Sequence, residues 1–280
     1  MSHLPTVRLV GDGELRDALA LCLRGSGAPH VEADADLELW VVPIGALRAL
    51  VRERRPGPAD RVILSSRGLE PGTGLRGSDV LLSESACLRV GALGGPLLPH
   101  ELRRQSPCAT VVASQYREVT RLGTAVLRSS LCRAYATEDL AGVELASALV
   151  EVFTVALGAA RGLGLGSGAE ALLVARAAVE GARLAARVGG DARTFSGLAG
   201  VGDLVACAAS PDHPGHRAGL ALCRGERLPE VATMCDALLA QAPGLPIVTG
   251  VRRVARGEVR VADALDVLMA SAHVGEWDDA

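Results

Sequence analysis

The N-terminal segment carries a glycine pattern with the spacing of a phosphate-binding turn. A short apolar run leads into Gly11-Asp12-Gly13, and a helical pattern begins directly afterwards. In such a strand–turn–helix unit the first glycine permits the tight turn, and the second lets the backbone approach a pyrophosphate at the helix N-terminus. Arg16 stands where a third glycine is expected, and Asp12 and Glu14 place carboxylates where an anion should bind. The pattern is therefore typical both of a cofactor site and of a turn without a ligand.

A second group of polar residues lies in the C-terminal half. Asp203 follows a glycine-rich segment, and Asp212, His213 and His216 come next in a turn that also contains proline and glycine. Aspartate and histidine at this spacing offer the donor atoms of a metal site. A Pro-Gly turn is more typical of solvated side chains, so we predict no metal site in the chain.

Composition limits the chemistry further. All 29 basic residues are arginine, and the chain contains neither lysine nor asparagine. Schiff-base catalysis on a lysine and a P-loop lysine are thereby excluded. A genome biased toward arginine codons accounts for most of this absence, but such a bias should still retain a lysine that the chemistry requires. The absence therefore bears on function as well as on codon usage.

The remaining composition excludes several classes of partner. The net charge is −3 without a basic stripe, and aromatic residues make up 2% of the chain, which disfavours nucleic-acid binding. No apolar run approaches the roughly 18 residues of a membrane helix. The seven cysteines are scattered without a CxxC pair, and we expect reduced thiols. We therefore predict a cytoplasmic protein with no membrane or nucleic-acid partner.

The elements that must position these residues change in character along the chain. Strands are predicted over residues 6–10, 37–43, 61–65, 90–93 and 110–113, with helices over 14–24 and 45–54. This alternation predicts a parallel α/β sheet. After about residue 137 only helical spacing remains, over 139–161, 169–188, 198–208, 229–242 and 261–272. The fold class is therefore α/β plus all-α, with a reduced Rossmann-like domain at 1–135 and a helical domain at 136–280.

Several motifs, in the order of the chain, resemble those of the NAD-dependent glycerol-3-phosphate dehydrogenase family. They are Val42-Pro43, Ser66–Thr73, Gly94-Gly-Pro96, Val111–Ala113, Gly142-Val-Glu-Leu145, Gly162–Gly166 and Thr194–Leu204. The resemblance covers essentially the whole chain. It implies a Rossmann domain with Gly11, Gly13 and Pro43 at the cofactor, and an ancestor that reduced dihydroxyacetone phosphate. It also implies a helical substrate domain through which a homodimer can form.

The chain departs from the family at positions that carry the family's chemistry. A lysine-asparagine pair in the helix after the Gly-Val-Glu-Leu motif is here Val150 and Glu151, and a second lysine is Arg67. Loss of a charge that stabilises the transition state costs on the order of 3–4 kcal/mol. The resemblance thus leaves Arg67 and Asp203 as the vestigial catalytic positions.

The family's phosphate-binding run is altered as well. Its arginine-asparagine pair is here Pro214-Gly215, and a threonine four residues after the aspartate is Cys207. Arg217 remains at the edge of this run. The resemblance therefore places Arg217, Cys207 and Glu151 at the substrate-binding positions.

The nucleotide-binding half is shortened. Glu32 lies about 20 residues after the glycines, where an acid that binds the ribose is expected. Residues 33–36 are too few for the crossover of about a dozen residues that a parallel neighbour strand requires. We therefore interpret Glu32 as a surface carboxylate, and we expect the adenosine half of the cofactor site to be damaged or missing.

Three hypotheses about function follow. The first is a catalytically inactive family member, a pseudoenzyme without a cofactor, that keeps the fold for a binding, regulatory or scaffold role with a protein partner. The second is an active NAD(P)-dependent oxidoreductase for glycerol 3-phosphate, dihydroxyacetone phosphate or a related substrate, with Arg67 as electrophile and Asp203 in a proton network. The third is a sensor of a small anion, in which Arg67, Arg176, Asp203 and Arg217 line one cleft.

Overall fold

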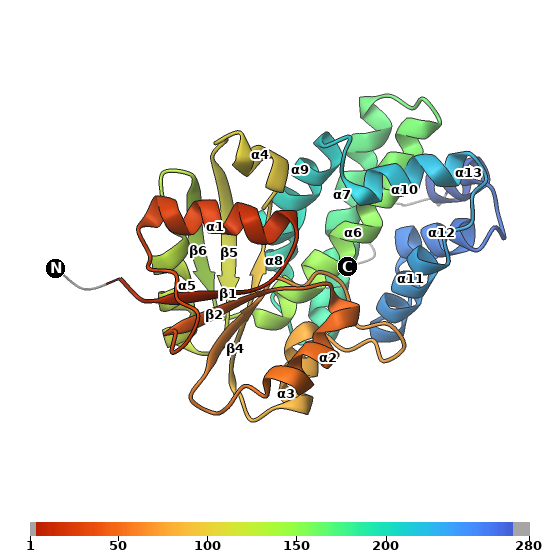
Figure 1. The fold of residues 1–280 in the computed structure, drawn as a ribbon. Coiled ribbons are helices and arrows are strands. Elements are labelled where there is room, and N and C mark those ends of the chain that lie inside the picture. The colour runs from red at the N-terminus through yellow and green to blue at the C-terminus, as the bar shows by residue number, and fades with distance from the viewer. Residues whose placement is uncertain (1–3, 271–280) are drawn as a thin grey trace.

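A six-stranded sheet organises the N-terminal half of the computed structural model, which describes residues 4–270 (Figure 1). The strands lie side by side in sequence order: β1 (Val7–Gly11), β2 (Leu37–Val41), β3 (Arg61–Leu64), β4 (Arg89–Gly94), β5 (Cys108–Ala113) and β6 (Cys132–Thr137). All neighbours pair in parallel except β4 and β5, which are antiparallel. The predicted fold class is confirmed. The antiparallel pairing of β4 and β5 was not predicted, because the apolar pattern of a short strand does not encode its direction. The strand β6 was not predicted either.

Helices cover both faces of this sheet. They are α1 (Glu14–Ser26), α2 (Ile44–Arg54), α3 (Gly77–Glu84), α4 (Pro99–Arg103) and α5 (Arg117–Leu127). One core forms where α1, α4 and α5 pack on one face, with Leu19, Leu102 and Val126 among its fully buried members. The other face packs against the C-terminal helices in a second core that includes Val90 and Val143.

The edge strand β1 is where the fold departs most from a complete Rossmann sheet. A dinucleotide-binding sheet has the order 3-2-1-4-5-6, with its first strand in the centre and strands on both sides. Here β1 pairs with β2 on one side, and on the other side it makes a single bridge, between Val7 and His30. Residues 31–36 form no helix or strand, and the side chain of Glu32 is 87% exposed. Glu32 is a surface carboxylate, as expected, and the crossover of the adenosine half is absent from the described residues.

The C-terminal half is helical. Its elements are α6 (Leu140–Gly162), α7 (Ser167–Arg187), α8 (Ala192–Ser196), the π-helical turn η1 (Leu198–Gly202), α9 (Asp203–Ala209), α10 (Pro214–Cys223), α11 (Pro229–Gln241), α12 (Pro246–Ala255) and α13 (Val261–Ala270). The helix expected over 198–208 is divided into η1 and α9. Residues 271–272 of the last expected helix lie outside the described residues. The sequence did not predict α10 and α12, although both begin with proline at the first helical position, where it is favoured.

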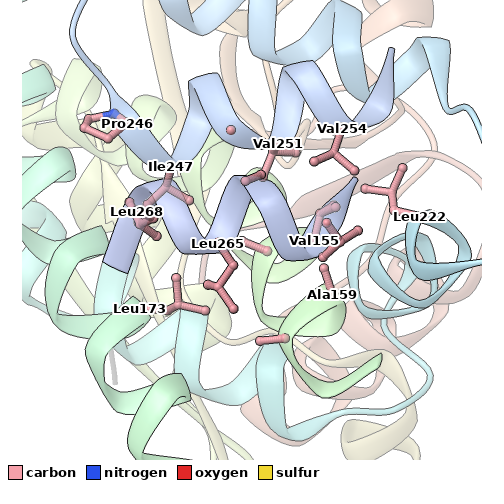
Figure 2. A pocket seen from close by; sticks show the side chains of 15 residues that line it. Val155, Ala159, Leu173, Leu222, Pro246, Ile247, Val251, Val254, Leu265 and Leu268 are labelled. Carbon is pink, nitrogen blue, oxygen red and sulfur yellow. The ribbon is translucent and has the colours of Figure 1, made fainter. Parts of the chain in front are cut away.

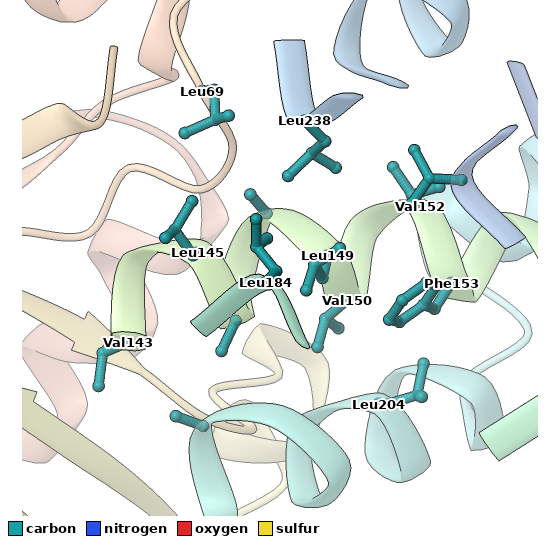
Figure 3. Close-up of a cluster of buried hydrophobic side chains, with 14 of the residues drawn as sticks. Leu69, Val143, Leu145, Leu149, Val150, Val152, Phe153, Leu184, Leu204 and Leu238 are labelled. Atoms are coloured by element: carbon teal, nitrogen blue, oxygen red, sulfur yellow. The ribbon is translucent and has the colours of Figure 1, made fainter. Parts of the chain in front are cut away.

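The central helix of this half is α6. It is long and apolar enough to cross a membrane, with a mean hydropathy of 1.8, which corrects the expectation that no segment approaches that length. Glu144 and Glu151 interrupt its apolar run but leave the average high. Because 83% of the apolar window is buried inside the protein, α6 is a core helix (Figure 3). Its core is continuous with the sheet through β4, so side chains from before and after residue 135 share one apolar cluster.

Two buried carboxyl groups connect elements of this core. On α6, Glu144 accepts hydrogen bonds from the backbone N–H and hydroxyl of Ser78 at the start of α3, at 2.7 and 2.5 Å. On α7, Glu180 accepts a hydrogen bond from the backbone N–H of Ile247 at the start of α12. Burial raises the pKa of Glu144 to about 7 and that of Glu180 to about 8. Both carboxyl groups cap the N-terminus of a neighbouring helix. Compared with the unfolded chain, the folded protein favours the protonated form of each group.

This preference predicts a pH dependence of stability that Glu180→Gln should reduce. Between the ordinary pKa of 4.5 and the folded-state pKa of about 8, the folded chain keeps a proton that the unfolded chain has lost. Glu180 therefore lowers the free energy of unfolding as pH rises, by at most about 1.4 kcal/mol per pH unit. Urea unfolding from pH 5 to 8 should show a flatter profile for Glu180→Gln than for Glu230→Gln, a matched change at an exposed residue. Parallel profiles for the two variants would contradict the assignment.

Candidate functional site

The C-terminal ends of β1, β2 and β3 meet at one edge of the sheet. Gly11 ends β1 with φ +105°, and a Cβ there would lie 2.0 Å from the carbonyl oxygen of Val41, so only glycine fits. The hydroxyl of Ser66, after β3, donates a hydrogen bond to the carbonyl oxygen of Val42 at 2.7 Å. Pro43 follows as the N-cap of α2. The structure thus brings Gly11 and Pro43 to the edge at which ligands bind in open α/β sheets.

Carboxylates surround the N-terminus of α1. Gly13 caps this helix with φ +87°, and no atom lies within 4 Å of where its Cβ would be, so the backbone there is open. Glu14 forms an ion pair with Arg103 of α4 at 3.2 Å, and Arg16 forms one with Asp17 at 3.4 Å. Glu14 and Asp17 in the first turn complement the positive end of the helix dipole. Acidic side chains of the chain itself, each paired with an arginine, therefore occupy the first turn at which a pyrophosphate would bind.

Arg67 is the centre of a polar cluster between the sheet and the helical half. Its guanidinium forms ion pairs with Asp203, the first residue of α9, and with Glu151 of α6, the latter at 3.3 Å between Nε and Oε1. Asp203 is fully buried, and its Oδ1 accepts a hydrogen bond from the thiol of Cys207 at 3.3 Å. Arg67 Nη1 lies 3.9 Å from that sulfur. We call these four residues the Arg67 cluster.

His213 lies against the Arg67 cluster. Its Nε2 is 3.9 Å from Oε1 of Glu151, and its Nδ1 accepts a hydrogen bond from the backbone N–H of Gly215 at 3.2 Å. Burial lowers the pKa of His213, so the imidazole is neutral at pH 7. The sequence suggested His213 only as a metal-type residue, and its position ten residues after Asp203 was the signal that could have placed it here. One cation therefore faces two carboxylates beside a neutral ring, and the cluster has a net negative charge.

Of the other predicted site residues, Arg217 is the one whose charge reaches His213 beside this cluster. Val150 is fully buried, and Figure 3 shows it on the side of α6 that faces Leu204 of α9. Arg217 is exposed and donates a hydrogen bond to the carbonyl oxygen of Asp212 in its own turn. Arg176 lies on α7, where its charge acts on Glu180. The structure therefore joins Arg67, Asp203, Glu151 and Cys207, and it leaves Val150 as an apolar contact.

A separate concave site lies among the C-terminal helices. It is formed by α6, α7, α10, α12 and α13, and Figure 2 shows the apolar side chains that line it, including Val155, Leu222, Ile247 and Leu265. No charged or hydrogen-bonding side chain lines this pocket, and none of its residues belongs to the Arg67 cluster. A phosphorylated ligand would therefore find no partner there.

Comparisons with known proteins indicate one family. Residues 139–266 match the NAD-dependent glycerol-3-phosphate dehydrogenase C-terminus, and residues 26–120 match its N-terminus, a match that begins after the Gly11–Gly13 turn. The chain is 32% identical over 276 residues to a glycerol-3-phosphate dehydrogenase [NAD(P)+] of Leptothrix cholodnii, covering 94% of this chain and 81% of that protein. It is 34% identical over 254 residues to the Methylibium petroleiphilum protein of the same name, covering 86% and 76%.

Solved structures agree on the fold. The Coxiella burnetii glycerol-3-phosphate dehydrogenase superposes with a TM-score of 0.85 at 24% identity, covering 96% of this chain and 99% of that one. The Plasmodium falciparum glycerol-3-phosphate dehydrogenase gives a TM-score of 0.82 at 11% identity, covering 97% of both chains. The sheet and the helical half are therefore arranged as in these proteins, although the sequences have diverged.

Proposed function

This chain belongs to the NAD-dependent glycerol-3-phosphate dehydrogenase family. We propose that it is a catalytically inactive member, a pseudoenzyme with a binding, regulatory or scaffold role. The relatives are, by their names, enzymes that use NAD(P)+, so the proposed loss is argued from this chain's own residues. The observation that carries it is the pairing of Arg67 with Asp203 and Glu151. Its charge is neutralised within the protein, and no lysine stands at Val150 to replace it.

The residues at the sheet edge do not fit a dinucleotide. A dinucleotide binds across a crevice in the sheet, and strands on each side of the crevice hold one half of the cofactor. Here β1 is an edge strand with one bridge beyond it, so no second strand is available to seat the adenosine half. Asp12 precedes the helix N-terminus where the pyrophosphate would bind, and Glu14 and Asp17 lie in the first turn, paired with Arg103 and Arg16. These carboxylates already complement the positive end of the helix dipole, which a pyrophosphate would otherwise use. We therefore assign no cofactor to the chain.

The substrate side is equally unfavourable for a phosphorylated ketone. Stabilising the developing alkoxide requires a donor or cation aimed at it, and loss of one such group costs on the order of 3–4 kcal/mol. Val150 offers an isopropyl group at that position. Glu151 adds a carboxylate 3.3 Å from Arg67, where a dianionic phosphate ester would have to approach. The cluster repels the charge that it would need to attract.

A second candidate function is an active NAD(P)-dependent oxidoreductase with a rebuilt site. The names of the relatives favour it, and so does the contact between Arg67 and Asp203, the two positions that the family resemblance marks as catalytic. In this alternative Arg67 would have to leave Asp203 and polarise the carbonyl group of a substrate. That movement would expose a buried carboxylate without its partner, which is a large energetic cost.

Cofactor titration separates the two candidates. NADH and NADPH fluorescence should show no saturable change up to millimolar cofactor with the purified chain, whereas the Leptothrix cholodnii relative serves as the positive control. A thermal-shift series with glycerol 3-phosphate should likewise give no concentration-dependent stabilisation. Saturable cofactor binding would favour the second candidate. Stabilisation by glycerol 3-phosphate alone, lost in Arg217→Met, would indicate the anion sensor instead.

The proposed binding role needs a compartment and a partner. All seven cysteines are free, which suits the reducing environment of the cytoplasm, where we place the protein. The helical half exposes Leu163, Val205, Val267 and Met269, large apolar side chains on α6 or its end, α9 and α13. We propose that a second copy of the chain, or another protein, covers this half.

A further inference from the structure

Three cysteines outside the Arg67 cluster meet in the core between the sheet and helices α1, α4 and α5. They are Cys22 of α1, Cys108 at the start of β5 and Cys132 at the start of β6. Their sulfur atoms all lie within 4.8 Å of one another. Within residues 4–270 no other set of three or more histidine, cysteine or acidic side chains brings its donor atoms so close. No CxxC motif marks these cysteines, because the three residues come from distant segments of the chain.

The fold holds these cysteines on three packed elements. Cys108 and Cys132 are register partners in the parallel β5–β6 pair, so their side chains leave the sheet on the same face. Cys22 lies on the buried face of α1 with Leu19 and Leu23, which packs on that face of the sheet. Because α1, β5 and β6 pack in one core, the backbone needs little reorganisation for the three sulfur atoms to bind one ion.

The three thiols lie close enough to shift one another's pKa values. The neighbouring thiols of Cys108 and Cys132 lower the pKa of Cys22 to about 4, whereas the thiols of Cys108 and Cys22 raise the pKa of Cys132. Cys22 and Cys132 are buried, and Cys108 is partly exposed, which leaves one side through which an ion can enter. A bound cation would displace the thiol protons, which leave to solvent as the thiolates coordinate.

The donor set selects the class of ion. Thiolates bind soft ions such as Cu(I) or Zn(II), and zinc requires a fourth ligand to complete a tetrahedron. No fourth histidine, cysteine or carboxylate joins the three sulfurs in the described part of the chain. With a metal–sulfur bond of about 2.3 Å, a trigonal site places its sulfurs about 4 Å apart. The three sulfurs here all lie within 4.8 Å of one another, which is compatible with such a site. We propose that Cys22, Cys108 and Cys132 form a three-coordinate site for a soft monovalent ion, copper(I).

Competitive titration tests this site on the full chain. The reduced protein, kept free of oxygen, is titrated with Cu(I) against a chromophoric Cu(I) chelator. We expect one equivalent to be withheld from the chelator, with ultraviolet absorption from sulfur-to-copper charge transfer. Cys108→Ser and Cys132→Ser should each weaken the affinity by more than about tenfold. Cys235→Ser, at a fully buried thiol outside the cluster, is the matched control and should bind as the wild type does.

Two outcomes would overturn the site. One is equal loss of affinity in Cys235→Ser, or no loss in either cluster variant. The other is a Zn(II) affinity above that for Cu(I) in the same competition, which would mean that a fourth ligand is present. Should a serine variant fail to fold, X-ray absorption of the Cu(I)-loaded wild type decides: three sulfur neighbours support the proposal, and nitrogen or oxygen neighbours reject it. This site is independent of the proposed function, because none of its residues touches the Arg67 cluster.

Discussion

Replacing Arg67 by methionine is expected to lower the free energy of unfolding by about 3–5 kcal/mol. The reason is Asp203, which is fully buried at the start of α9 and has Arg67 as its ion-pair partner. Removing the guanidinium leaves a carboxylate without a counter-ion in the core, and it also leaves Glu151 unpaired. Methionine keeps the aliphatic stem, so the loss measures the charge rather than the packing. Urea unfolding at pH 7 provides the measurement.

Two further variants separate the ion pair from other effects of the change. In Arg67→Met/Asp203→Asn the buried charge is removed together with its partner, and most of the lost stability should return. Arg193→Met breaks an ion pair with Asp191 in which the arginine side chain is 90% exposed, and it should leave the unfolding midpoint unchanged. If Arg67→Met is no more destabilising than Arg193→Met, Arg67 is not tied to Asp203 in solution, and its charge is available to a ligand.

The second large effect is on catalysis: the purified chain should show no turnover of dihydroxyacetone phosphate with NADH. Two separate changes lead to this expectation. In the proposed function, β1 as an edge strand offers no second strand for the adenosine half, and acidic residues already complement the N-terminus of α1. At the position where the family resemblance implies a catalytic lysine, Val150 offers no cation, an expected loss of on the order of 3–4 kcal/mol, or hundreds-fold in rate. One loss affects cofactor binding and the other affects the chemical step, so their effects on the rate multiply.

The broad fold could be predicted because its signals are local. The alternation of strands and helices, and the long apolar spacing that became α6, are properties of consecutive residues. The strand β6 was missed because its alternate residues, Arg133 and Tyr135, are exposed, so the segment lacks a continuous apolar run. The shortened loop before β2 correctly predicted the missing crossover, because four residues cannot span one.

The site could be predicted only in part, because its contacts join distant segments. Arg67 and Asp203 were singled out by the family resemblance, but their direct pairing and the approach of Glu151 depend on how α6 and α9 pack on the sheet. The same holds for Cys22, Cys108 and Cys132, whose convergence depends on the register of β5 and β6. Residue types and spacing indicate candidates, and only tertiary packing decides which charges neutralise one another.

The oxidation of NADH by dihydroxyacetone phosphate, followed at 340 nm with the purified chain, tests the central claim most directly. The Leptothrix cholodnii relative provides the positive control, and Arg67→Met the matched variant. We predict that the wild-type rate equals the blank without protein at millimolar substrate and cofactor, and that Arg67→Met does not differ from it. A substrate-dependent rate above the blank that Arg67→Met abolishes would contradict the account and identify the chain as an active dehydrogenase.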